Sequence, residues 1–120
     1  MLYQNQYVTA EESPTGLILH IRGEIDHHIA PAIRTEVDRM ILYTGKKTVI
    51  LDLSAVEFMD SSGLGLLMGR KALTDKLGKE LLVRNPAARI FKILDLAGLT
   101  KILNIKYKNG GKNHAESMQK

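Results

Sequence analysis

The feature that most constrains the fold is the apolar run TVILDL at residues 48–53. Val49, Ile50 and Leu51 follow one another with no polar residue between them, and β-branched side chains favour strands. A strand that is apolar at successive positions is typical of a parallel sheet, in which both faces are covered. The run therefore predicts an α/β domain with this strand in its interior.

The segments around this strand predict helices that alternate with further strands. Turn residues at 13–16 (SPTG) precede the apolar segment 17–22, which predicts a β-hairpin. Apolar residues then recur about every fourth position from Ile29 to a stop signal at Gly45, which predicts an amphipathic helix. The remaining predicted elements are a helix at 61–77, a strand at 80–83, a helix at 87–97 that starts with an Asn85 N-cap and Pro86, and a short strand at 102–107. This β-β-α-β-α-β-α-β order indicates a small α/β domain in which helices pack on a mixed β-sheet.

Length and composition indicate one domain. The 120 residues suffice for a single hydrophobic core, and 44% apolar with 25% charged residues is typical of a globular protein. No apolar run approaches the roughly 18 residues of a membrane-spanning helix, and the N-terminal residues do not resemble a secretion signal. We therefore expect a soluble, cytoplasmic protein with no membrane partner. The lack of Cys excludes disulfides, thiolate metal sites and Cys nucleophiles.

The net charge of +4 does not indicate nucleic-acid binding, because most of it lies near the C-terminus. Residues 106–120 carry four Lys and one Glu, a net charge of +3, which leaves +1 for the rest of the chain. A nucleic-acid surface needs clustered basic residues, usually with aromatic residues beside them, and this chain has no Trp. We therefore expect no nucleic-acid partner. We assign residues 1–107 to the domain and 108–120 to a polar, flexible C-terminal tail.

Two polar segments follow predicted strands and are candidates for a functional surface. They are residues 23–28 (GEIDHH) and residues 57–63 (EFMDSSG). Functional loops of open α/β sheets gather at the carboxyl ends of the parallel strands. We therefore expect these two loops to be neighbours.

The segment DSSGLG at residues 60–65 places three capping side chains at the start of a predicted helix. A helix N-terminus has free N–H groups and a partial positive charge, so it favours Asp or Ser and can also accept a phosphate. One interpretation is ordinary capping by Asp60 or Ser61, followed by a Gly pair that allows close packing on the sheet. The other is that one hydroxyl is exposed for phosphorylation, which would add a charge of about −2 without harming the helix.

The glycines of this segment also raise an alternative, a nucleotide-binding or nucleotide-hydrolysing module at the helix start. Gly63, Gly65 and Gly69 follow a strand, as the glycines of dinucleotide-binding sites do. However, the third Gly comes one position late, and the next predicted strand ends near Arg84 rather than in an acidic residue. The pattern is therefore a weak indication of nucleotide chemistry.

The histidines do not indicate a metal site or an enzyme. Asp26, His27 and His28 are adjacent, but we expect the two His side chains to diverge, and no third His or Cys lies at metal-binding spacing. No Gly-x-Ser-x-Gly motif holds a Ser nucleophile in a strained turn. We therefore expect no catalytic residues, no bound metal and no cofactor.

Two motifs resemble those of the bacterial anti-sigma factor antagonists, which are single STAS domains of the sporulation and general-stress type. The first motif is GEIDHH at residues 23–28, and the second is FMDSSGLG at residues 58–65, continued by LLMGR. The resemblance extends over about residues 1–107 and includes the order of helices and strands. It implies a STAS fold for the predicted α/β domain.

The resemblance implies that the protein is a regulatory switch and not an enzyme. In this family the unphosphorylated antagonist binds an anti-sigma factor that is also a serine protein kinase, and this releases the sigma factor to activate transcription. The kinase, which supplies the ATP and magnesium, phosphorylates the first Ser of the motif, here Ser61, and a metal-dependent serine phosphatase reverses the reaction. A scaffold STAS domain that is never phosphorylated is the other possibility. The implied partner-binding residues are Glu24, Asp26, His27, His28, Asp60, Ser61, Ser62, Gly63 and Leu64.

Overall fold

The computed structural model describes residues 3–4 and 6–108, which form a six-stranded sheet with helices packed on it. The predicted element order is confirmed, with a two-residue strand added at its beginning. The elements are β1 (Tyr3–Gln4), β2 (Val8–Ser13), β3 (Gly16–Ile25), α1 (Ala30–Tyr43), β4 (Thr48–Met59), α2 (Ser61–Lys76), β5 (Glu80–Arg84), α3 (Ala88–Leu96), the 3-10 turn η1 (Leu99–Lys101) and β6 (Asn104–Lys106).

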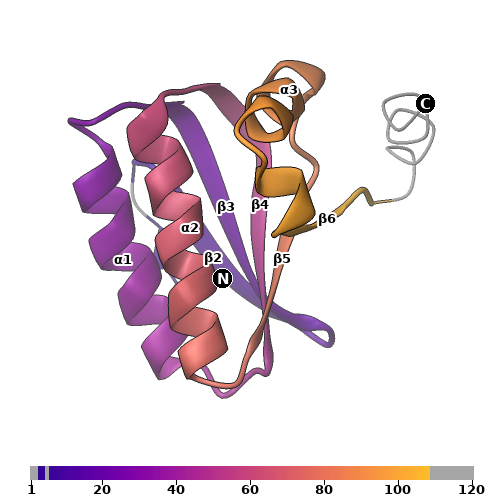
Figure 1. Cartoon of the computed structure of the whole chain (residues 1–120). Coiled ribbons are helices and arrows are strands. Elements are labelled where there is room, and N and C mark those ends of the chain that lie inside the picture. Colours follow the sequence, from indigo (N-terminus) through magenta and orange to yellow (C-terminus); the bar gives the residue numbers. More distant parts are fainter. Residues whose placement is uncertain (1–2, 5, 109–120) are drawn as a thin grey trace.

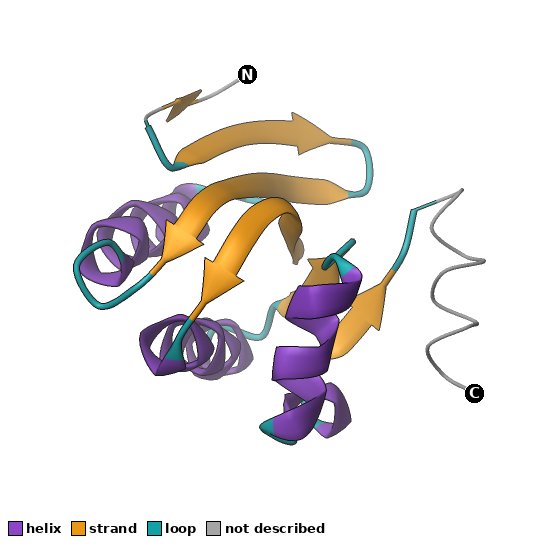
Figure 2. Cartoon of the chain, turned by 90° about the horizontal axis from the view of Figure 1, so that it is seen from above, coloured by secondary structure: helices purple, strands orange, loops and turns teal. Residues whose placement is uncertain are grey.

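The sheet is mixed, as predicted. Its strands follow one another in chain order from β1 to β6. The pairs β1–β2 and β2–β3 are antiparallel, whereas β3, β4, β5 and β6 run parallel to one another. Helices α1 and α2 lie side by side on one face of the sheet, and α3 lies towards the β5 side (Figures 1 and 2). The carboxyl ends of β3 and β4 therefore lie side by side, and α1 and α2 begin just after them.

The hydrophobic core lies between the sheet and the helices. Residues Val49, Leu51 and Leu53 of β4 are fully buried in it. Helix α1 contributes Ile33, Val37 and Ile41, the apolar positions at a spacing of four that predicted this helix. The predicted burial of the central strand is confirmed.

Strand β4 is longer than the predicted run at residues 48–53. It continues to Met59 because Val56 and Met59 are buried on the core side while Glu57 and Phe58 face outwards. The extension pairs with the end of β3, where Ile25 lies opposite Met59, after two irregularities in the register. Residues 57–59, predicted as a loop, are therefore the end of a strand.

The start of the third helix was also predicted wrongly. Asn85 does not cap it, because Asn85 adopts a left-handed conformation with φ of 59° and its N–H donates to the Lys106 carbonyl at 2.9 Å. Its side chain donates to Asp52 and accepts from the N–H of Lys108. Asn85 therefore joins the end of β5 to β4 and to the residues after β6. Helix α3 begins three residues later, with Ala87 at the N-cap position.

No helix of the described residues is long and apolar enough to cross a membrane. The described residues end at Lys108, the first residue of the predicted tail, so residues 109–120 lie outside them. The predicted boundary between domain and tail stays a prediction.

Candidate functional site

The ends of β3 and β4 bring the two predicted loops together. Glu24 lies opposite Phe58, and Ile25 lies opposite Met59 in the parallel register. The N–H of Asp60 donates to the Ile25 carbonyl at 3.2 Å, which ties the start of α2 directly to the end of β3. The predicted neighbourhood of the two segments is confirmed, although the first three residues of each segment belong to a strand.

Asp60 is the N-cap of α2. Its Oδ1 accepts a hydrogen bond from the Ser62 N–H at 2.8 Å, and its backbone is extended while the following residues are helical. Ser61 is the first helical residue and is exposed, and its hydroxyl has no hydrogen-bond partner among the described residues. Of the two capping side chains that the sequence left open, Asp60 therefore takes the role, and the Ser61 hydroxyl faces solvent.

The next three residues of α2 face different surroundings. Ser62 is half-buried and points towards α1, whereas Leu64 packs against the core. Gly63 is buried so closely that a Cβ in its place would lie 2.2 Å from Cγ of Met59 and 3.3 Å from Cγ2 of Ile25. Gly63 thus allows the helix to start against the strand ends, as predicted. The prediction was wrong for the second glycine of the pair, because Gly65 is exposed and a Cβ there would have no atom within 4 Å.

Asp26 shapes the turn between β3 and α1. Its Oδ1 accepts hydrogen bonds from the N–H groups of His28 at 2.9 Å and Ile29 at 3.1 Å. The bond from Ile29, more than the other contacts, holds the pKa of Asp26 below its ordinary value. The rings of His27 and His28 do not diverge as predicted, because their centroids lie 4.0 Å apart at a tilt of 39°. Both histidines are exposed.

Apolar residues near Ser61 are exposed at positions that the sequence reasoning did not select. Phe58, at the end of β4, is 45% exposed, and Met68 of α2 is 39% exposed. Met68 lies seven residues after Ser61, which is two helical turns, so the two lie on the same side of α2. This helical spacing was the signal in the sequence that could have identified Met68.

A second group of residues lines an open hollow beside Phe58. It contains Glu24 at the end of β3, Glu57 of β4 and Arg89 near the start of α3. Of these only Glu24 was predicted as a site residue. The described residues contain no group of three or more potential metal ligands.

The chain matches known proteins over most of its length. Residues 7–110 match the STAS domain family. The sequence is 35% identical over 101 residues to an anti-sigma F factor antagonist of Paenibacillus polymyxa, covering 84% of this chain and 86% of the relative. It is 30% identical over 107 residues to the anti-sigma-B factor antagonist of Bacillus subtilis, covering 89% of this chain and 96% of the relative.

The fold also matches solved structures. The Bacillus cell fate determinant SpoIIAA, solved in its phosphorylated form, superposes with a TM-score of 0.66 at 23% identity, covering 92% of this chain and 98% of the other. This likeness establishes a common fold. The chain belongs to the STAS domain family, and within it to the anti-sigma factor antagonists. The resemblance in the two motifs is thereby confirmed.

Proposed function

We propose that the protein is a switch that binds an anti-sigma factor with serine kinase activity and thereby releases a sigma factor. Phosphorylation of Ser61 inactivates it, and a metal-dependent serine phosphatase restores it. The protein itself acts without catalysis or a cofactor, in the cytoplasm, and without nucleic acid or a membrane. The names of the two relatives, antagonists of anti-sigma F and anti-sigma-B factors, support a role in sporulation or the stress response.

The observation that carries the proposal is the contrast between the two serines. Ser61 is exposed and makes no hydrogen bond with the described residues, whereas Ser62 is half-buried and faces α1. A kinase must reach the hydroxyl that it phosphorylates, which favours Ser61. Asp60 already caps the helix, so modification of Ser61 does not remove a capping bond.

The docking surface that we propose surrounds Ser61. It combines the predicted residues of the β3–α1 turn, Glu24, Asp26, His27 and His28, with Asp60, Ser61, Ser62, Gly63 and Leu64 of the α2 start. We add the exposed Phe58 and Met68, because apolar side chains supply much of the binding energy at protein interfaces. Gly63 and Asp60 contribute mainly by fixing the position of α2.

The phosphate acts at the interface and not on the fold. A phosphate at a helix N-terminus meets free N–H groups and the positive end of the helix dipole, so its effect on the helix is neutral or mildly stabilising, on the order of 1 kcal/mol. Against a partner shaped for a hydroxyl, an unpaired buried charge costs about 2–5 kcal/mol. This corresponds to roughly 30-fold to several-thousand-fold weaker binding.

The test compares the two serines with the anti-sigma factor kinase of the same host. We expect Ser61→Ala to bind this kinase as wild type does and to accept no phosphate from ATP, and Ser61→Asp to bind poorly. Ser62→Ala, the matched control, should still be phosphorylated. Tandem mass spectrometry locates the phosphate, and titration calorimetry measures the dissociation constants.

Two results would contradict the proposal. One is a phosphate on Ser62, and the other is a phosphorylated protein that binds the kinase as tightly as the unmodified one. No observation supports the nucleotide-binding alternative, which predicts instead that the isolated chain binds ATP or GTP tightly and does not respond to the kinase.

A further inference from the structure

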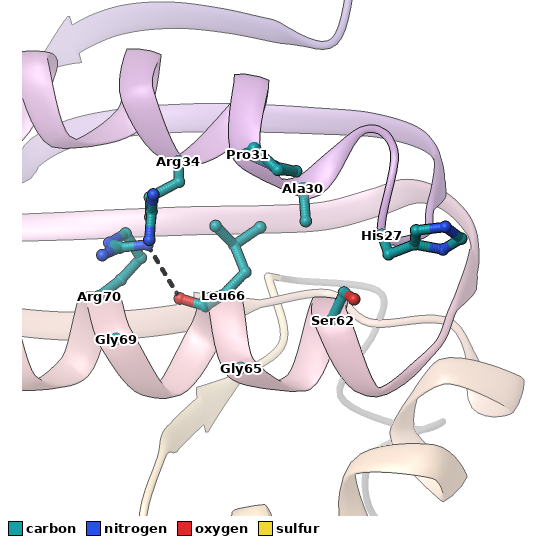
Figure 3. Close-up of a pocket in the computed structure, with 9 residues that line it drawn as sticks. All are labelled: His27, Ala30, Pro31, Arg34, Ser62, Gly65, Leu66, Gly69 and Arg70. Atoms are coloured by element: carbon teal, nitrogen blue, oxygen red, sulfur yellow. Dashed lines mark hydrogen bonds between the residues drawn. The ribbon is translucent and has the colours of Figure 1, made fainter.

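A groove separates α1 from α2 beside the proposed docking surface. Its volume is about 260 Å³, and Figure 3 shows the side chains that line it. His27 and Ser62 lie at the end nearest to Ser61, and Arg34 and Arg70 lie one to two helical turns further along. The groove is therefore continuous with the docking surface at one end and basic at the other.

The middle of the groove is open because α2 has glycines there. Gly65 and Gly69 both line it, and a Cβ added to either would have no atom within 4 Å. These glycines leave room for an atom group from outside the chain. The space alone does not indicate which chemical group binds in the groove. The two arginines that line it, Arg34 and Arg70, indicate the charge of that group.

Arg70 is buried yet incompletely bonded. Its side chain is 8% exposed, and its Nε lies 2.7 Å from Oδ1 of Asp38, without the alignment of a hydrogen bond. Its Nη1 donates one long bond, 3.4 Å, to the Leu66 carbonyl (Figure 3). Guanidinium groups have five N–H donors, so Arg70 has donors left for a further acceptor in the groove.

Arg34 adds a second positive charge at the same place. Burial lowers the pKa of Arg70, the carboxylate of Asp38 opposes this effect, and the nearby charge of Arg34 lowers the pKa further. Arg34 is exposed, and no carboxylate or other acceptor among the described residues bonds to it. Asp38 thus offsets the charge of Arg70 alone, and the charge of Arg34 stays open to the groove.

We propose that this groove receives a carboxylate side chain, Asp or Glu, of the anti-sigma factor, which Arg34 binds with help from Arg70. The inference rests on the proposed function and names the chemistry of the partner. Guanidinium groups bind carboxylates through paired, charge-assisted hydrogen bonds. Because Ser62 and His27 line both the groove and the docking surface, a partner that covers Ser61 also reaches the groove entrance.

The test replaces Arg34 with Gln, which removes the charge and keeps the helix propensity. We expect the dissociation constant for the host's anti-sigma factor kinase to rise about 5- to 50-fold, with a weaker dependence on salt concentration. Lys47→Gln is the matched control, since Lys47 is exposed and precedes β4, at the opposite end of this strand from Ser61. This control should bind as wild type does. Gly65→Leu, which fills the groove, should weaken binding while the thermal midpoint does not fall.

The outcomes separate this inference from the proposed function. If wild type and Arg34→Gln bind the kinase equally, the groove inference is wrong and the proposed function stands. If wild type does not bind the kinase, both are wrong. Inorganic phosphate titrated into the isolated protein tests the other source of an anion. If phosphate shifts the Arg34 side-chain NMR signal while Arg34→Gln binds the kinase normally, the groove is a free-anion site and the inference is overturned.

Discussion

At the scale of single residues, Asp52 shows how the sheet holds a buried charge. It is 3% exposed, and its Oδ1 accepts from the N–H and hydroxyl of Ser54 at 3.0 and 2.6 Å. Its Oδ2 accepts from Nε of Arg84 at 2.8 Å and from Nδ2 of Asn85 at 3.3 Å. Burial alone would raise the pKa of Asp52, but the bonds from Ser54, followed by that from Arg84, lower it below its ordinary value of 3.8. The ionised carboxylate of Asp52 therefore joins β4 to the end of β5 through its bonds from Arg84 and Asn85.

We predict that Asp52→Asn lowers the free energy of unfolding by about 2–4 kcal/mol at neutral pH, because Arg84 loses its buried partner. The folded pKa is below the unfolded one, so the charged carboxylate stabilises the fold above the unfolded pKa. This stabilisation is lost as the pH falls through the folded pKa. The difference between wild type and variant should thus narrow below about pH 4. Urea unfolding from neutral to acidic pH measures it, and a difference that does not change with pH would contradict this account.

At the scale of elements, helix α2 has glycines with opposite roles. Gly63 is in contact with Met59 and Ile25, whereas Gly65 has open space beside it. Gly63 lets the helix approach the sheet and places Ser61 at the strand ends. Gly65 has no packing role in the isolated chain, which is consistent with a surface left free for a partner.

We predict opposite effects of alanine at these two positions. Gly63→Ala should destabilise the protein by about 1–3 kcal/mol, because the new methyl group overlaps Met59 in a packed core. Gly65→Ala should stabilise it by about 0.5–1 kcal/mol, since Ala has the higher helix propensity. Chemical denaturation of the pair measures both effects. Stabilisation by both substitutions would show that the strand end moves away at little cost.

At the scale of the whole molecule, the last described residues attach the chain to the sheet. The Tyr107 hydroxyl donates to the Pro86 carbonyl at 2.7 Å, and the N–H of Lys108 donates to Oδ1 of Asn85 at 2.9 Å. These bonds, together with the pairing of β6 to β5, complete the sheet. These contacts therefore extend to Lys108, the last described residue.

We predict that a chain truncated after Lys108 keeps its stability and its partner binding. The deleted residues are mostly polar or charged and lie outside the alternating pattern of predicted helices and strands, so the thermal midpoint should change by less than about 3 °C. Truncation after Leu103 is the control, because it also removes β6 and the Tyr107 bond. That control should unfold at a clearly lower temperature. Equal losses in the two chains would mean that the tail packs on the domain.

The sequence by itself determined the order of helices and strands, the buried central strand and the position of Ser61 at the start of α2. These features depend on local periodicity, capping and turn residues, which neighbouring positions specify. Only the tertiary structure decided that β4 extends to Met59, that Asn85 adopts a left-handed conformation instead of capping α3, and that Arg34 and Arg70 line one groove. Each of these depends on contacts between residues far apart in the chain, such as Met59 with Ile25 and Asn85 with Lys106. No local pattern encodes such contacts, because they form only when separate elements pack together.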